Sequence, residues 1–223
     1  MNVAAIIVTR GDQWGALRES VLPSLPEEWD VLVWDNGAEV LIDARRITSV
    51  RVSDLSVYGR YAAIEYTDAD LIYVQDDDCI VSDPQALVRA WAELQGAATI
   101  DPNPPPPPAE HYVVCNMPPE FRHDFYTDHA LVGFGAVFHR DAPQRAFIEY
   151  ERARGMNEML GTSGEFFRRT CDIVFTALTP RVLVDVPKEN LPYSYHYDRM
   201  WRQPEHQAER ARMLELVGQV RGG

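Results

Sequence analysis

Short apolar runs alternate with more polar segments along the first third of the chain. Residues 3–8 form a continuous apolar run that ends at Thr9, and residues 31–34 and 71–74 repeat this pattern. Runs of this length without polar alternation are typical of strands buried on both faces of a parallel sheet. Residues 58–69 have the composition and spacing of a helix between two such runs. We therefore expect an α/β sheet covered by helices.

The remaining elements follow from the same patterns and from helix start signals. Asp83 followed by Pro84 is a strong helix start, and five consecutive prolines at residues 104–108 predict an extended connector. Further strands are expected at residues 50–52, 112–115, 131–139 and 181–186, and helices at residues 84–96, after Asp141, at 164–178 and from 205 to the end. Residues 187–204 are expected to form a loop.

Three consecutive carboxylates end the apolar run at residues 71–74. Asp76, Asp77 and Asp78 repel one another, so a fold that gathers them at a strand end is expected to supply a cation or hydrogen-bond donors. Alternation along an extended strand puts Asp76 and Asp78 on one side and Asp77 on the other. Oxygen ligands of this kind suit Mg2+ or Mn2+. The alternatives are a solvated turn that caps the next helix, or a calcium loop, whose central glycine and closing glutamate are missing.

Composition and charge narrow the classes of partner. A chain of 223 residues with 46% apolar and 25% charged residues is expected to form one folded domain. The net charge of −13 argues against nucleic acid and against an anionic membrane surface as partners. Three widely spaced cysteines predict neither disulfides nor a zinc site. Because residues 1–8 lack the features of a signal peptide and no apolar run reaches membrane-spanning length, we expect no membrane span and a cytoplasmic location.

Four short motifs in this order resemble the nucleotide-sugar-dependent glycosyltransferases of the GT-A fold. The motifs are Ile7-Val8-Thr9-Arg10, Val33-Trp34-Asp35-Asn36-Gly37, Gly59-Arg60-Tyr61-Ala62-Ala63 and Tyr73-Val74-Gln75-Asp76-Asp77-Asp78. The resemblance implies a GT-A (Rossmann-like) α/β fold, with a mixed, mostly parallel sheet flanked by helices in a single domain. It also implies a metal-dependent glycosyltransferase of the hexosyltransferase type, with Mn2+ or Mg2+ as cofactor, a nucleotide-diphosphate sugar as donor (a UDP-sugar is favoured) and an acceptor of unknown identity.

The same resemblance divides the chain and assigns the donor side. It implies a nucleotide-sugar-binding half at residues 1–100, a Pro-rich connector at 101–110, an acceptor-side half at 111–204 and a C-terminal helix at 205–223. Asp78 is expected to contact the metal and Asp76 to contact the metal or the ribose. The nucleotide pocket is expected to include Thr9, Arg10, Asp35, Asn36, Arg60, Asp76 and Asp77. Asp35 could instead be a turn former, and Arg60 a surface helix residue.

On the acceptor side, the resemblance implies a catalytic carboxylate at the start of a late helix. Asp172 is the first candidate, and Glu165, seven residues earlier on the same helical face, is the substitute. The alternative for Asp172 is an ion pair with Arg168, four residues before it. His196 is a candidate third metal ligand, the alternative being a surface histidine.

Two other functions remain open from the sequence. Asp76-Asp77-Asp78-Cys79 followed by Val81-Ser82-Asp83-Pro84 also looks like the reversibly glycosylated polypeptide family, which includes nucleotide-sugar mutases. A mutase would isomerise the donor ring in the absence of acceptor. A non-catalytic protein that binds sugar nucleotides would bind the donor without turnover.

Overall fold

The fold is known from a computed structural model. It describes residues 2–11, 14–36, 47–51, 54–97, 109–122, 126–154, 164–195 and 199–222. Most of the Pro-rich connector and His196 therefore lie outside the described residues.

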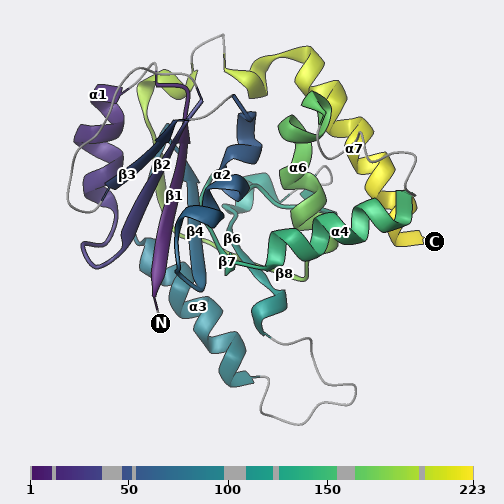
Figure 1. Cartoon of the computed structure of the whole chain (residues 1–223), viewed down its shortest axis with the longest axis horizontal. Coiled ribbons are helices and arrows are strands. Elements are labelled where there is room, and N and C mark those ends of the chain that lie inside the picture. The colour runs from purple at the N-terminus through teal and green to yellow at the C-terminus, as the bar shows by residue number, and fades with distance from the viewer. Residues whose placement is uncertain are drawn as a thin grey trace.

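A seven-stranded sheet runs through the middle of the protein (Figure 1). Its strand order is β3 (Ile47–Arg51), β2 (Asp30–Asp35), β1 (Val3–Thr9), β4 (Leu71–Asp76), β7 (Ala136–His139), β6 (Val113–Asn116) and β8 (Arg181–Val184). The pairs of β1 with β2 and β4, of β2 with β3 and of β6 with β8 are parallel, whereas β7 is antiparallel to both of its neighbours. The predicted fold class, a mixed and mostly parallel α/β sheet in a single domain, is confirmed.

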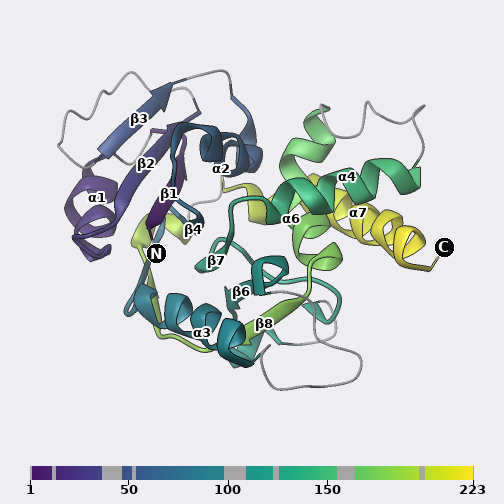
Figure 2. The same ribbon diagram turned by 60° about the horizontal axis from the view of Figure 1, so that its bottom comes forward.

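Helices cover both faces of this sheet (Figures 1 and 2). They are α1 (Trp14–Ala16), α2 (Gly59–Ala62), α3 (Pro84–Ala97), α4 (Ala142–Arg154), α6 (Glu165–Leu178) and α7 (Pro204–Gly222). Along β1, Ala4 and Ile6 pack toward α2, α4 and α6, whereas Ala5 and Ile7 pack toward α3 and the turns after α1. Both faces of the strand are buried, which explains why its sequence is continuously apolar.

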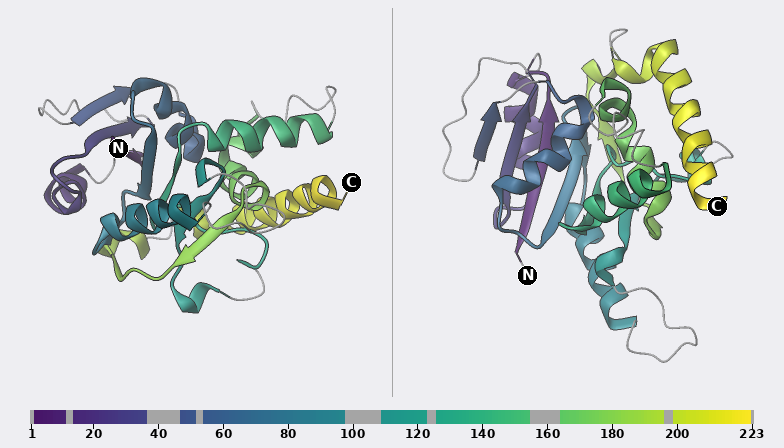
Figure 3. Two further views of the ribbon diagram at one scale, coloured as in Figure 1. Left: turned by 90° about the horizontal axis from the view of Figure 1, so that it is seen from below. Right: turned by 45° about the vertical axis from the view of Figure 1, so that its right-hand side comes forward.

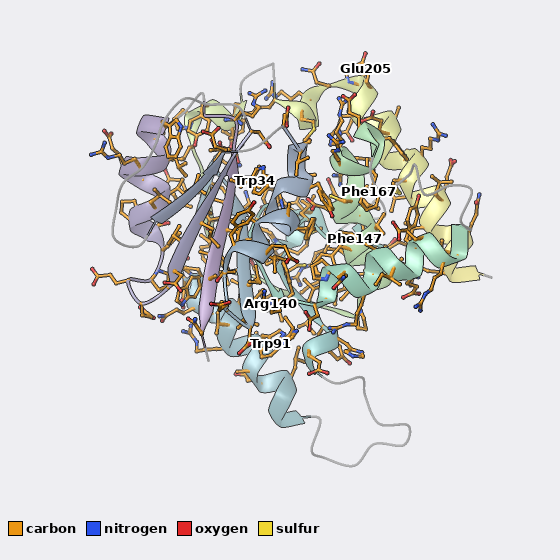
Figure 4. The ribbon with its side chains drawn as sticks, viewed as in Figure 1. Trp34, Trp91, Arg140, Phe147, Phe167 and Glu205 are labelled. Carbon is orange, nitrogen blue, oxygen red and sulfur yellow. The ribbon has the colours of Figure 1, made fainter. Side chains whose placement is uncertain are left out.

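Aromatic side chains join α4 and α6 to the sheet. The ring centroids of Phe147 on α4 and Phe167 on α6 lie 5.2 Å apart, between these helices and the sheet (Figure 4). Helix α7 packs along α6 and buries Met213 and Val217 (Figure 3). No helix in the described part of the chain has the length and apolar composition that a bilayer crossing requires.

Several local predictions are wrong in their bounds or type. The strand expected over residues 131–139 is confined to β7, because the chain turns at Gly133 and Gly135 has a φ of +105°. The loop expected over residues 187–204 contains β9 (Lys188–Asn190), which pairs antiparallel with β5 (Cys79–Val81). The helix expected over residues 58–69 consists of α2 between two 3-10 turns and ends at Tyr66.

The contact between α6 and α7 contains a buried histidine. His206 is 3% exposed, its Nδ1 lies 3.7 Å from Glu209 Oε2, and Arg169 Nε lies 3.3 Å from the same oxygen. Burial lowers the pKa of His206 to about 4, and the charges of Arg210 and Arg169 act in the same direction. The folded protein therefore resists protonation of this ring.

This buried histidine should make the protein less stable in mild acid. Because its folded pKa lies below that of an unfolded histidine, the stabilisation is complete above about pH 6.5 and decreases as the pH falls toward 4. Between pH 7.5 and pH 5 this group is expected to lower the free energy of unfolding by about 2 kcal/mol. Urea unfolding of the wild type and of His206→Gln at both pH values should show this additional decrease in the wild type only. Equal losses in the two proteins would contradict the assignment.

Candidate active site at the carboxyl ends of the strands

The predicted donor-side residues lie at one edge of the sheet. Thr9 ends β1, Asp35 ends β2 and Asp76 ends β4. In the register of the parallel pairs, Thr9 is opposite Asp35 and Val8 is opposite Asp76. Ligands of α/β sheets bind at this edge, because the loops that leave parallel strands gather there.

Asp77 is directed into the protein, unlike the carboxylates on either side of it. It is 4% exposed, and its Oδ2 accepts a hydrogen bond of 2.7 Å from Thr9 Oγ1. The backbone N–H of Gly11 donates to the same Thr9 hydroxyl at 3.0 Å. Thr9 and Asp77 thus connect the loop after β1 to the turn after β4. These contacts support a structural role for both residues, and their predicted contact with a nucleotide stays a prediction.

The C-terminal part of the chain is attached to the same turn. The Tyr193 hydroxyl donates to the carbonyl oxygen of Asp77, and the N–H of Leu191 donates to the carbonyl oxygen of Asp78 at 2.8 Å. Arg199 Nη1 lies 3.6 Å from Asp77 Oδ1, and the guanidinium lies 4.8 Å from the centre of the Tyr193 ring. Sequence reasoning missed Arg199. An arginine in an aromatic loop of an acidic chain was the available signal.

Arg60 joins the end of β4 to helix α6. Its Nη2 lies 2.8 Å from Asp76 Oδ1 and its Nη1 lies 3.2 Å from Asp172 Oδ2. The Tyr61 hydroxyl donates to Asp172 Oδ1 at 2.6 Å. Helix α2 begins at Gly59, where an added Cβ would come within 2.3 Å of the Trp34 ring, so the helix is packed tightly against β2. This close contact positions Arg60, which is the second residue of the helix.

Two of the sequence alternatives can be decided from this geometry. Arg60 is 2% exposed, so it is not a surface helix residue. The ion pair of Asp172 is made with Arg60 and not with Arg168, whose Nη1 donates to the carbonyl oxygen of Asp54 at 3.5 Å. Asp76 and Asp172 are therefore parts of one site, although 96 residues separate them in the sequence.

The environment changes the acidity of the groups in this site. Burial raises the pKa of Asp172, against the opposing effects of the Arg60 charge and the Tyr61 hydrogen bond. Burial opposes the charge of Arg60, but the charges of Asp172 and Asp76 outweigh it and raise the Arg60 pKa. The Arg60 guanidinium is therefore a permanent cation between two carboxylates.

The metal ion predicted at Asp76 and Asp78 stays a prediction. Burial, followed by the charges of Asp76 and Asp77, raises the pKa of Asp78 to about 7, against the opposing charge of Arg199. The Asp76 side chain is 43% exposed and has Oδ1 on Arg60. Two carboxylates fit a hard cation such as Mg2+ or Mn2+. The described residues contain no cluster of three His, Cys, Asp or Glu side chains, and the third predicted ligand, His196, lies outside them.

The other predicted site residues have different surroundings. Asn36 Oδ1 accepts from Trp34 Nε1 and from the N–H of Leu55, and Asn36 Nδ2 donates to the carbonyl oxygen of Ser56. This amide holds the segment before α2 in place, which supports a structural role.

Glu165 is 82% exposed and pairs with Arg169 at 3.2 Å, outside the network of Asp172. Asp35 is fully buried and Arg10 is exposed. Their predicted contacts with the nucleotide, and the catalytic role of Glu165, stay predictions.

A separate groove of about 640 Å3 lies between the segment around α2 and helix α4. Tyr58, Phe147 and Phe167 line it together with charged residues such as Glu65 and Arg168. Tyr61 also lines this groove, while its hydroxyl binds Asp172. None of the carboxylates of the triplet faces it, so the groove is distinct from the candidate active site.

Gly133 touches the carboxylate of Asp76. An added Cβ at Gly133 would lie 2.0 Å from Asp76 Oδ2, and the N–H of Asp76 donates to the carbonyl oxygen of Gly133 at 2.8 Å. The space beside this glycine backbone is therefore occupied by a side chain of the protein itself. Cys79 packs against the same carbonyl, with its Sγ 3.4 Å away, as a buried thiol.

Gly133→Ala should displace Asp76 and weaken its ion pair with Arg60. Overpacking of this kind is expected to lower the free energy of unfolding by about 1–3 kcal/mol. The matched control is Gly218→Ala on α7, where an added Cβ meets no atom within 4 Å. This change should raise stability by about 0.5–1 kcal/mol, because glycine is unfavourable inside a helix. Urea unfolding measures both, and equal stability of the two variants would contradict the contact at Asp76.

No protein-family model matches the chain, and no curated protein sequence matches it significantly. Among solved structures, the chain is similar to TarS 1–349 from S. aureus, at 11% identity and a TM-score of 0.47, over 99% of this chain and 70% of that chain. The same fragment in complex with UDP-GlcNAc gives 10% identity and a TM-score of 0.44, over 99% and 71% of the two chains.

A third similar structure is the mannosyltransferase PcManGT from Pyrobaculum calidifontis, in complex with GDP-Man and Mn2+. The identity is 16% and the TM-score is 0.49, over 96% of this chain and 64% of that chain. The chain thus spans less than two thirds of the mannosyltransferase. At these identities the likeness concerns the fold alone.

Proposed function

We propose that this chain is a metal-dependent glycosyltransferase of the hexosyltransferase type. It would transfer a sugar from a nucleotide-diphosphate sugar, with a UDP-sugar favoured, to an acceptor hydroxyl. The observation that carries the proposal is the Arg60 bridge, which joins a carboxylate at the strand end to a carboxylate on α6. Such a reaction requires one carboxylate beside the donor and a second one beside the acceptor, and the bridge holds both in one site.

The donor would lie over the carboxyl ends of β1, β2 and β4. Thr9, Asp35 and the turn after β4 surround this edge, and Asp76 and Asp78 would hold Mn2+ or Mg2+. When bound, the cation supplies positive charge against the diphosphate that leaves. The residues of the chain itself fix this edge, because Thr9, Tyr193 and Arg199 hold Asp77 and so fix the direction of its neighbours.

Asp172 would act as the general base. The bond between the acceptor oxygen and the anomeric carbon forms, the bond from that carbon to the diphosphate oxygen breaks, and the acceptor proton passes to Asp172. Arg60 and Tyr61 orient the carboxylate and stabilise its ionised form before the transfer. The nucleoside diphosphate leaves with the electron pair of the broken bond.

A reducing compartment, the cytoplasm, suits this protein. All three cysteines are free and buried, and burial raises the pKa of each thiol. Thiols of this kind are unreactive packing groups.

The donor site can be tested by calorimetric titration of UDP- and GDP-sugars with and without Mn2+. Mn2+ should strengthen the binding of at least one sugar nucleotide. Asp78→Asn should bind this nucleotide at least about tenfold more weakly than the wild type in the presence of Mn2+. Asp83→Asn is the matched control, because Asp83 lies five residues further along and forms an exposed ion pair with Arg89. Its binding should equal that of the wild type. Binding that is independent of the metal, or unchanged in Asp78→Asn, would contradict the donor site.

The base can be tested by comparing Asp172→Asn with Glu165→Gln. Asp172→Asn should bind the donor as tightly as the wild type but should release nucleotide from it, with water as acceptor, at least about a hundredfold more slowly. Glu165→Gln should retain the wild-type rate, because this carboxylate is exposed and pairs with Arg169. The opposite result would transfer the role to Glu165. An isomerised donor in this assay would indicate a mutase.

A further inference from the structure

The charge of the chain is distributed unevenly. Residues 1–164 contain 12 Lys and Arg against 26 Asp and Glu, whereas residues 165–223 contain nine Lys and Arg against eight Asp and Glu. The acidic character therefore belongs to the first three quarters of the chain. The last quarter, which contains α6 and α7, is nearly neutral and rich in arginine.

Arg210 on α7 is a partly buried cation without a carboxylate partner. Within the described part of the chain, no Asp or Glu oxygen lies within 4 Å of its guanidinium, and its hydrogen-bond partner is His129 Nε2 at 3.1 Å. Burial lowers the pKa of Arg210, which remains charged, while the charges of Tyr126, Asp172 and Asp76 act in the opposite direction. Withdrawing a cation from water without a counter-charge is unfavourable.

His129 supplies no counter-charge. It is fully buried, and burial, together with the charges of Arg210 and Arg181, lowers its pKa to about 3. The ring is therefore neutral at physiological pH, and its Nε2 accepts the hydrogen bond from Arg210. The histidine orients the guanidinium but gives it no ion-pair partner.

Arg210 is connected to the helix of the proposed base through His129 and Thr176. Thr176 Oγ1 donates to the carbonyl oxygen of Asp172 at 2.8 Å and accepts from the N–H of Ala130 at 3.1 Å. Ala130 follows His129 in the chain, so His129 and its partner Arg210 lie against the turn of α6 that begins at Asp172. The charges of Asp172 and Arg210 influence each other across this contact.

Arg210 lies on α7, in the part of the fold away from β1 and β2. The proposed donor edge is formed over β1, β2 and β4, whereas residues 126–133 lead into β7, the neighbour of β4 on the side away from β1. Figures 1 and 2 show α6 and α7 on this far side, away from β1, β2 and β3. A group bound at Arg210 would thus approach Asp172 from the side of α7, whereas the nucleotide would lie over β1, β2 and β4.

We propose that Arg210 binds an anionic group, a phosphate or a carboxylate, carried by the acceptor. This assignment rests on the proposed function, because only a second substrate would occupy this side of the site. An arginine presents several N–H donors to a phosphate or carboxylate, which makes it suited to this role. The acceptor anion would supply the direct ion-pair partner that Arg210 lacks among the described residues, and it would place the acceptor hydroxyl near Asp172.

The test is calorimetric titration of inorganic phosphate without added metal, in the absence of nucleotide and again with the donor pocket saturated by UDP. The wild type should bind phosphate under both conditions. Arg210→Gln should bind it at least about tenfold more weakly, and Arg210→Lys should retain part of the affinity. Arg212→Gln is the matched control, because Arg212 lies on the same helix against the Phe166 ring, and it should bind phosphate like the wild type.

The other outcomes would overturn the proposal or would assign the bound anion to the donor and not to the acceptor. Equal phosphate binding by the wild type and Arg210→Gln, or none by the wild type, would overturn the proposal. Phosphate binding that UDP abolishes would assign Arg210 to the donor's diphosphate and would also overturn it. If the Gln variant does not fold, the Lys variant and the UDP competition decide between these outcomes. Nucleotide-sugar binding should be unchanged in Arg210→Gln, and its absence in the wild type would instead reject the proposed function.

Discussion

The ion pairs of Arg60 with Asp76 and Asp172 are the interaction on which the organisation of the site depends. The two carboxylates are held beside one another by the buried guanidinium between them, because removal of Arg60 would leave two negative charges without their cation in a low-dielectric interior. The same interaction connects two parts of the fold, the strand end of β4 and helix α6. Helix α6 therefore has a fixed position relative to the sheet edge, and Asp172 has a fixed distance to the acidic turn.

The three carboxylates of this turn are stabilised in three different ways. Asp76 is paired with Arg60, and Asp77 is buried with Thr9 and lies near Arg199. Asp78 has no comparable compensation, and burial and its neighbours raise its pKa. A run of identical residues thus has one member bound by a cation of the protein, one used to hold the fold together and one that retains an incompletely compensated charge. This division is the physical basis for assigning a ligand to Asp78.

The sequence predicts the strands around the site well, because β1, β2 and β4 are buried on both faces and their apolar runs are unbroken. It also places Thr9, Asp35 and Asp76 at one edge, since parallel strands end together. It does not predict β9, whose residues Lys188, Glu189 and Asn190 have no apolar pattern and are held by backbone pairing with β5.

Contacts between residues that are far apart in the sequence cannot be predicted from local patterns. A search for the partner of Asp172 within one helical turn points to Arg168, whereas the actual partner, Arg60, is 112 residues away in the sequence. Strand β4 ends at Asp76, so the direction of Asp77 and its contact with Thr9 are known only from the structure.

The attachment of Tyr193 and Arg199 to Asp77 has a consequence for the order in which the protein is made. The strands β1 to β4 are complete within the first 76 residues, and a chain emerging from the ribosome can begin to pair them early. The contacts to Asp77 span 116 residues for Tyr193 and 122 for Arg199, and such distant contacts form late in folding. Until they form, the middle carboxylate of the acidic turn has Thr9 as a partner but lacks Arg199, and the turn lacks Tyr193. Synthesis through residue 199 therefore precedes assembly of the site, and a nascent chain that ends before Tyr193 would have the sheet edge without these two contacts.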